Sequence, residues 1–218
     1  MDEDRREFLR QSWGAAALAI GGQPGAPPGK LAEAGDLIAR MTWLNEPASH
    51  ARSDGKLVVR SRGKTDFWRK TFYGYVTDNG HFLHLSAPAE FTFQARVGGR
   101  YAAQYDQAGL MVRLDPENWM KCGTELVDGR RQASVVFTRG FSDWSTMPDL
   151  SATEPIWWRA VRKKDSIEVL CSLDGLAFAA VRQGYFPPRA LAYVGIMCAA
   201  PEGAGFEAVF DELRLEGG

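Results

Sequence analysis

Apolar and polar residues alternate along much of the chain after residue 40. The segment Phe91–Val97 reads Phe-Thr-Phe-Gln-Ala-Arg-Val, with an apolar side chain at every second position. Because successive side chains of a β-strand point to opposite faces, this pattern predicts a strand with one face on a core. Further short runs rich in β-branched and aromatic residues predict more strands, at Leu57–Ser61, Phe82–Ser86, Ala108–Leu114, Met120–Val127, Ala133–Thr138, Ile156–Arg162, Ile167–Leu173, Phe178–Gln183, Leu191–Cys198 and Phe206–Leu215.

Turn-forming residues separate the predicted strands. Asp-Gly pairs stand at 54–55, 128–129 and 174–175. Aspartate and glycine adopt the backbone angles that tight turns require, so these pairs predict hairpins. No convincing amphipathic helix lies between them, and strands at this spacing predict an all-β fold with antiparallel sheets, a β-sandwich or a barrel. The stretch 140–155 is longer than an ordinary hairpin loop and is a candidate functional loop.

Two predicted hairpins give residues 107–138 a definite register. Turns at 115–117 and 128–129 predict three cross-strand pairs, which are Met111 with Lys121, Gln107 with Glu125, and Glu125 with Gln132. One face of this segment is apolar apart from Thr124 and is the predicted core between two sheets; it contains Ala108, Leu110, Val112, Leu114, Met120, Cys122, Leu126, Ala133, Val135 and Phe137.

The opposite face of the same segment mixes polar, charged and apolar residues. Its members are Gln107, Gly109, Met111, Arg113, Trp119, Lys121, Gly123, Glu125, Gln132, Ser134, Val136 and Thr138. A solvent-exposed outer face explains most of this set. Three members, Met111, Trp119 and Val136, are apolar where solvent favours polar residues. The two glycines have no side chain and would leave room for a ligand on the sheet surface. Polar groups interleaved with an aromatic suit a sugar ring, so a groove for carbohydrate is the favoured interpretation.

The first forty residues differ from the rest of the chain. Arg5-Arg6 precedes Phe8-Leu9 and a short Ala-rich apolar run at 13–20, which resembles a bacterial twin-arginine export signal. Ala32-Glu33-Ala34 offers a cleavage motif. Alternatively, residues 1–40 are an upstream extension and translation starts at Met41. We therefore expect a signal or disordered extension at 1–40 and one sandwich domain at 41–218, in the periplasm or outside the cell, or in the cytoplasm if Met41 is the start.

Composition and charge exclude several classes of protein. The 218 residues carry 26 Lys and Arg against 27 Asp and Glu, which gives no electrostatic reason to expect nucleic-acid binding. The apolar run at 13–20 is shorter than the roughly 20 residues that a transmembrane helix needs. Three cysteines without a Cys-x-x-Cys pair indicate neither a zinc ribbon nor a disulfide scaffold.

Several motifs in order resemble one known family. They are Trp43-Leu44-Asn45-Glu46-Pro47, Thr65-Asp66-Phe67-Trp68-Arg69-Lys70-Thr71, Tyr105-Asp106-Gln107-Ala108-Gly109-Leu110-Met111, Trp119-Met120-Lys121, Glu125 and Ser142-Asp143-Trp144-Ser145. The chain is similar to a domain-of-unknown-function family of the concanavalin A-like lectin/glucanase superfamily, whose fungal members are called regulation-of-enolase proteins. The resemblance implies a jelly-roll β-sandwich with a concave face, and it implies no reaction, because a shared fold does not supply one.

Catalysis is the alternative to binding. Glycoside hydrolysis requires two carboxyl groups, about 5–5.5 Å apart for retention or about 6.5–9.5 Å for inversion. The strand Lys121–Val127 carries only Glu125, so a second acid would come from a loop, where Asp66, Asp106 and Asp143 are candidates that more often serve as turn residues. Lys121 on the same face is expected to favour ionised Glu125 and to oppose a general-acid role. An enzyme of glycosidase or polysaccharide-lyase type would use Glu125 with Asp106 or Asp143.

Metal and cofactor signals are weak. His81 and His84 are three residues apart, which on a strand directs them to opposite faces. No cofactor or metal is therefore expected, although calcium bound by loop aspartates remains open.

The favoured prediction is a non-catalytic, lectin-like domain, with a protein-interaction module as a further alternative. Aromatic residues would stack on a sugar and polar residues would bind its hydroxyls. For the aromatic residues in loops, packing at a sandwich end is the competing interpretation. The predicted ligand-binding residues are Trp68, Tyr73, Gln107, Met111, Arg113, Trp119, Lys121, Glu125, Arg139, Asp143 and Trp144.

Overall fold

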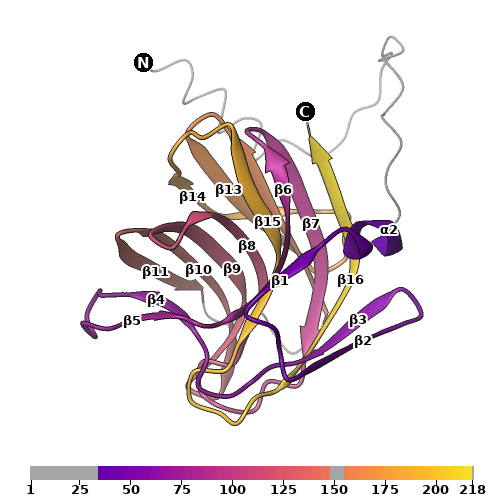
Figure 1. The fold of residues 1–218 in the computed structure, drawn as a ribbon, viewed down its shortest axis with the longest axis vertical. Coiled ribbons are helices and arrows are strands. Elements are labelled where there is room, and N and C mark those ends of the chain that lie inside the picture. Colours follow the sequence, from indigo (N-terminus) through magenta and orange to yellow (C-terminus); the bar gives the residue numbers. More distant parts are fainter. Residues whose placement is uncertain (1–33, 148–154, 218) are drawn as a thin grey trace. The chain divides into compact units, whose positions relative to one another are not determined.

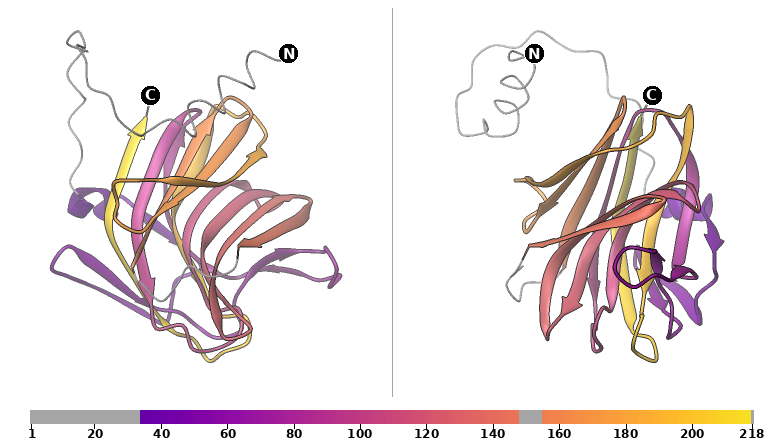
Figure 2. Two further views of the ribbon diagram at one scale, coloured as in Figure 1. Left: turned by 180° about the vertical axis from the view of Figure 1, so that it is seen from behind. Right: turned by 90° about the vertical axis from the view of Figure 1, so that its left-hand side faces the viewer.

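A computed structural model of the chain describes residues 34–147 and 155–217 (Figure 1). Most of the predicted export signal and the stretch 148–154 lie outside the described residues. The described chain forms two large antiparallel sheets, which face each other as layers (Figure 2). The predicted all-β jelly-roll sandwich is confirmed.

The first sheet has seven strands in the order β1-β6-β15-β8-β9-β10-β11. Their bounds are β1 Thr42–Leu44, β6 His81–Pro88, β8 Gln107–Asp115, β9 Asn118–Val127, β10 Arg130–Arg139, β11 Phe141–Met147 and β15 Leu191–Ala199. All three cross-strand pairs predicted for residues 107–138 are present, because the two short turns leave the strands no other register.

The second sheet also has seven strands, in the order β14-β13-β12-β7-β16-β3-β2. Their bounds are β2 Ser49–Ser53, β3 Lys56–Arg60, β7 Phe91–Gly99, β12 Ile156–Lys163, β13 Ser166–Ser172, β14 Ala179–Tyr185 and β16 Glu207–Gly217. A separate two-stranded hairpin consists of β4 Phe67–Arg69 and β5 Val76–Asp78.

The core lies between the two large sheets. Apolar side chains from both form one cluster that includes Leu110, Met120 and Val135 from the predicted core face. The three cysteines are free and buried in it, Cys122 on β9, Cys171 on β13 and Cys198 on β15. Burial raises the pKa of all three thiols, because it disfavours the charged thiolate. These cysteines are core residues and not nucleophiles.

Two elements differ from the expectation. Residues 141–147 of the predicted functional loop form β11, which pairs with β10 along its whole length. A short helix, α2 (Ala34–Ala39), lies upstream of the expected domain boundary at residue 40. Its Leu37 and Ile38 are 2% and 4% exposed and belong to the core cluster, so the packed domain begins before Met41.

Candidate functional site

The β4–β5 hairpin covers part of the outer face of the first sheet, the face that points away from the core. Phe67 of β4 is fully buried and packs edge-on against Trp119 of β9, with ring centroids 6.2 Å apart. Around this contact a second apolar cluster has formed, which contains Phe67, Trp68, Phe82, Met111, Trp119, Val136, Met197 and Ala199. We call this the closed half of the face.

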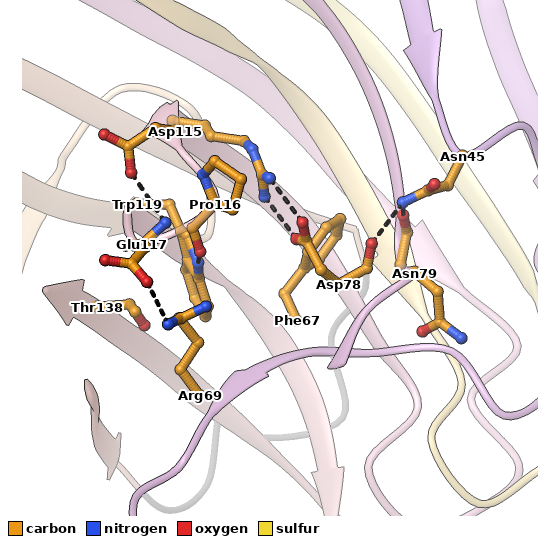
Figure 3. Close-up of polar contacts among 12 residues, drawn as sticks. Asn45, Phe67, Arg69, Asp78, Asn79, Asp115, Pro116, Glu117, Trp119 and Thr138 are labelled. Carbon is orange, nitrogen blue, oxygen red and sulfur yellow. Dashed lines mark hydrogen bonds and ion pairs between the residues drawn. The ribbon is translucent and has the colours of Figure 1, made fainter. Parts of the chain in front are cut away.

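Hydrogen bonds and ion pairs connect the edges of the β4–β5 hairpin to the rest of the domain (Figure 3). Both nitrogens of the Arg113 guanidinium donate to the Asp78 carboxylate, at 2.6 and 2.7 Å. Arg69 Nη2 donates to Glu117 Oε1 at 2.6 Å. The Asn45 side-chain amide donates to the backbone carbonyl of Asp78 at 2.9 Å. Bidentate charged pairs of this kind fix orientation as well as distance, so the hairpin has a defined position on the sheet.

Beside the closed half lies a pocket of about 390 Å³. Three buried polar side chains form its floor: Gln107 on β8, and Lys121 and Glu125 on β9. Lys121 Nζ donates to Asp66 Oδ1 at 2.9 Å. Gln107 Nε2 lies 3.4 Å from the same Asp66 oxygen and 3.3 Å from Glu125 Oε1. Two carboxyl groups therefore flank one amide at the floor of the pocket.

Glu125 is the strongly perturbed group of this pocket. Burial raises its pKa to about 7, since an ionised carboxylate is poorly solvated there. Lys121, Ser134 and Trp144 act in the opposite direction without cancelling the effect of burial. Lys121 favours the ionised form of Glu125, as expected, but its effect is smaller than that of burial, so the pKa of the carboxyl still lies near 7.

Aromatic rings form the wall of the pocket, and they come from three parts of the chain. The rings belong to Trp68, Tyr73, Tyr75, Tyr105 and Trp144. Trp68 and Tyr105 each meet Trp144 edge-on, with ring centroids 6.4 and 6.3 Å apart. The indole N–H of Trp68 donates to the Thr71 carbonyl, and that of Trp144 donates to Ser134 Oγ. These hydrogen bonds fix the positions of both rings.

Tyr105 has a backbone conformation that is unusual for a bulky residue. Its φ is 65°, in the left-handed region, and its N–H donates to the Leu126 carbonyl at 2.7 Å. Such a conformation costs roughly 1–3 kcal/mol and persists only where surrounding contacts enforce it. Strain of this kind is concentrated at functional sites, which fits the position of Tyr105 in the pocket wall.

A second hollow, of about 460 Å³, adjoins the pocket. Trp68, Tyr73 and Trp144 line both spaces. The second hollow also has Phe72, which is 93% exposed, and Asp143, whose carboxylate pairs with Arg182 Nη2 at 2.8 Å.

The structure brings together about half of the predicted ligand-binding residues. Those that line the pocket are Trp68, Tyr73, Gln107, Lys121, Glu125 and Trp144. Asp143 lines the adjoining hollow. The pocket residues that the sequence analysis did not name as ligand-binding are Asp66, Tyr75, Tyr105, Val136, Pro201 and Glu202. Most of these lie in loops, where no alternation of apolar and polar residues predicts which way a side chain points.

Four predicted ligand-binding residues lie elsewhere. Met111 and Trp119 are 0% and 1% exposed beneath the hairpin, and Arg113 is held by Asp78. Trp119 anchors the covering hairpin, so its ring is not free to stack on a sugar. Arg139 is exposed at the end of β10, where its guanidinium lies 5.6 Å from the Tyr185 ring centroid and lines neither hollow.

Asp106 is a turn residue and not a candidate acid of the pocket. It is 1% exposed, and its Oδ2 accepts hydrogen bonds from the backbone N–H groups of Ala102 and Ala103, both at 2.9 Å. Of the loop aspartates considered as a second acid, Asp66 is the one beside Glu125.

Gly109 and Gly123 stand opposite each other on β8 and β9. A Cβ on Gly109 would collide with the backbone of Cys122, and one on Gly123 with the backbone of Ala108. The glycines therefore permit close approach of two strands and do not provide floor space for a ligand.

The described residues are 34–147 and 155–217. Within them no group of three or more His, Cys, Asp or Glu side chains is placed to hold a metal ion. None of the helices in this part of the chain has the length and apolar character needed to cross a membrane.

Comparison with known proteins gives one clear set of relatives. The model of the family described as "Protein of unknown function (DUF1349)" matches residues 43–217. Regulation of enolase protein 1 of Saccharomyces cerevisiae is 40% identical over 178 residues, which are 82% of this chain and 90% of the yeast protein. A crystal structure of a functionally unknown protein from Saccharomyces cerevisiae superposes with a TM-score of 0.80 at 40% identity, covering 83% of this chain and 98% of that one.

More distant solved structures share the fold alone. The carbohydrate-binding module CBM66 from Bacillus subtilis has a TM-score of 0.55 at 13% identity, covering 81% of this chain and 97% of the module. A mutant of the GH43 protein BlXynB from Bacillus licheniformis has a TM-score of 0.63 at 17% identity, covering 82% of this chain and 37% of that protein. The sandwich thus occurs both in a sugar-binding module and in a protein of a glycoside hydrolase family.

Proposed function

The chain belongs to the DUF1349 family of proteins of unknown function, and on that premise we propose that it is a non-catalytic carbohydrate-binding domain. The observation that carries the proposal is the pocket, in which two tryptophans and three tyrosines surround a floor of Gln107, Lys121 and Glu125. Aromatic rings fit the apolar C–H faces of a sugar, and the polar floor offers donors and acceptors to its hydroxyls.

The size and cover of the pocket indicate which part of a carbohydrate it takes. Its volume of about 390 Å³ lies in the range of small-ligand sites, roughly 300–1,000 Å³. The β4–β5 hairpin occupies the neighbouring part of the sheet face, with Phe67 packed on Trp119. A polysaccharide therefore cannot lie across the whole face. We infer that the pocket takes a single sugar or the end of a chain, which continues over the adjoining hollow.

The test is binding of a sugar panel by the full chain, measured by isothermal titration calorimetry. Trp144→Ala removes a wall ring that is 36% exposed, and the unfolding free energy of the variant is measured beside its binding. An aromatic contact contributes about 0.5–1.5 kcal/mol beyond its buried area, and we expect roughly tenfold weaker binding or more. Phe141→Ala is the matched control, since Phe141 is an exposed aromatic on the same strand that lines neither hollow. Absence of binding across the panel, or equal affinity of the two variants, would contradict the proposal.

Glycoside hydrolysis is a second candidate, which one observation favours. Asp66 and Glu125 both lie within 3.4 Å of Gln107 Nε2. With a pKa of about 7, Glu125 holds a proton that it could donate, while Asp66 accepts from Lys121. Hydrolases use one protonated and one ionised carboxyl group in this way. Release of reducing sugar that is abolished in Glu125→Gln, with binding retained, would establish hydrolysis; a rate equal to background in the wild type would support binding alone.

A further inference from the structure

Acidic side chains outnumber basic ones among the residues that line the pocket. Asp66, Glu125 and Glu202 carry carboxyl groups, whereas Lys121 is the basic residue of the lining. Lys121 Nζ lies 2.9 Å from Asp66 Oδ1, so its charge is directed to that carboxylate. Lys64 reaches the rim, where its Nζ donates to the backbone carbonyl of Glu202 at 2.7 Å. Glu125, the carboxyl group of the floor, lines the same pocket as the aromatic rings.

Acidic neighbours add to burial in raising the pKa of two tyrosines of the pocket. The pKa of Tyr73 is raised by burial and then by neighbouring groups that include Tyr105 and Glu125. The pKa of Tyr75 is raised by burial, by Asp66 and by Glu202. Both phenols therefore sit where additional negative charge is disfavoured. The contributions of Glu125, Asp66 and Glu202, unlike that of burial, would favour a positive charge in the same space.

Aromatic rings add to this preference. The face of a tryptophan or tyrosine ring carries the negative part of its quadrupole and attracts cations, most strongly where water is excluded. Five such rings line the pocket, together with the carboxyl group of Glu125. Several aromatic faces combined with a carboxylate are the arrangement that binds an organic ammonium ion.

We propose that the pocket selects a sugar that carries an ammonium group over the corresponding neutral sugar. This inference rests on the proposed carbohydrate binding and names its ligand class: an amino sugar, with the ammonium group placed between Glu125 and the rings of Trp144 and Tyr105. The Lys121–Asp66 pair remains intact, and Gln107 binds a hydroxyl of the same sugar.

Binding of such a cation is coupled to a proton. The groups around Glu125 are Lys121 on its own strand, Gln107 on β8, Ser134 on β10, Trp144 on β11, Asp66 before β4 and Tyr73 between β4 and β5. A bound ammonium ion stabilises the ionised carboxylate, so the protonated fraction of Glu125 loses its proton when the ligand binds. Calorimetry in two buffers of different ionisation enthalpy, at a pH low enough for the amines of the sugar to be fully protonated, measures this release directly. The Glu125→Gln variant has no such proton to release.

The experiment compares three disaccharides that differ at one substituent: chitobiose, with free amines, N,N′-diacetylchitobiose, with the amines masked, and cellobiose, with hydroxyls. We expect chitobiose to bind the full chain at least tenfold more tightly than the other two, with release of a proton. Glu125→Gln should abolish most of that difference, and Glu202→Gln should reduce it two- to threefold. Glu216→Gln is the control, because Glu216 is exposed on β16 of the other sheet.

The outcomes separate this inference from the proposed function. Equal affinity for all three sugars, or preference for a neutral one, would overturn the choice of an ammonium group and leave carbohydrate binding intact. If no sugar binds, both proposals fail. Binding of tetramethylammonium ion with no binding of any sugar would likewise overturn carbohydrate as the ligand of the pocket. A Glu125→Gln variant that keeps both the preference and the proton release would overturn the role of Glu125.

Discussion

The outer face of the first sheet has a closed half and an open half, the pocket, and both are built on the same strands. On β9, Trp119 lies in the closed half, whereas Lys121 and Glu125 point into the pocket. Period two places all three on one face. The β4–β5 hairpin makes the difference, because Phe67 covers Trp119 and leaves the floor around Glu125 uncovered. An aromatic residue on a mixed face can therefore hold a covering hairpin in place instead of forming part of a binding surface.

The largest expected effect comes from removing the ring that covers the closed half. Phe67→Ala leaves a cavity over Trp119, and large-to-small changes at a fully buried phenylalanine cost about 3–5 kcal/mol of unfolding free energy. Phe72→Ala is the matched control, since Phe72 belongs to the same hairpin segment but is 93% exposed; its effect should stay within about 0.5 kcal/mol. Denaturant unfolding measures both. Equal effects would show that the hairpin does not cover the sheet as described.

A smaller effect is expected from breaking the charged pair at the edge of the hairpin. Asp78→Asn leaves the Arg113 guanidinium, only 6% exposed, without its carboxylate. Because Asp78 itself is one-third exposed, we expect a loss of about 2–3 kcal/mol, below the 3–5 kcal/mol of a fully buried pair. The double variant Asp78→Asn/Arg113→Met removes the stranded charge and should regain part of the loss. A double variant less stable than Asp78→Asn would contradict this account.

The smallest effect concerns the open half and depends on pH. The pKa of Glu125 is raised from 4.5 to about 7 in the folded protein. Between these values the folded state binds more protons than the unfolded state, so stability falls as pH rises through this window. Between about pH 5 and pH 7 the loss from this group is on the order of 2 kcal/mol. Unfolding curves at several pH values should show a shallower decline for Glu125→Gln than for the wild type; parallel curves would mean that Glu125 is not perturbed.

The sequence predicted the sandwich and the pocket floor for the same physical reason. Strands with strict alternation have one possible buried face, and two short turns fix the pairing of Gln107 with Glu125. The cover could not be predicted in this way. Strands β4 and β5 have three residues each, too few for a period, and Asp78 and Arg113 are 35 positions apart. Tyr105 and Glu202 reach the pocket from loops, where the chain path and not a periodicity decides the neighbours.

Labelling of the three buried cysteine thiols can measure how often the core of the sandwich opens. Cys122 and Cys198 belong to the first sheet and Cys171 to the second. All three are shielded from solvent by the packing of one sheet on the other. A thiol reagent can reach them only through an opening of that packing. The rate at which each cysteine is labelled therefore reports how readily the packing between the sheets opens near that residue.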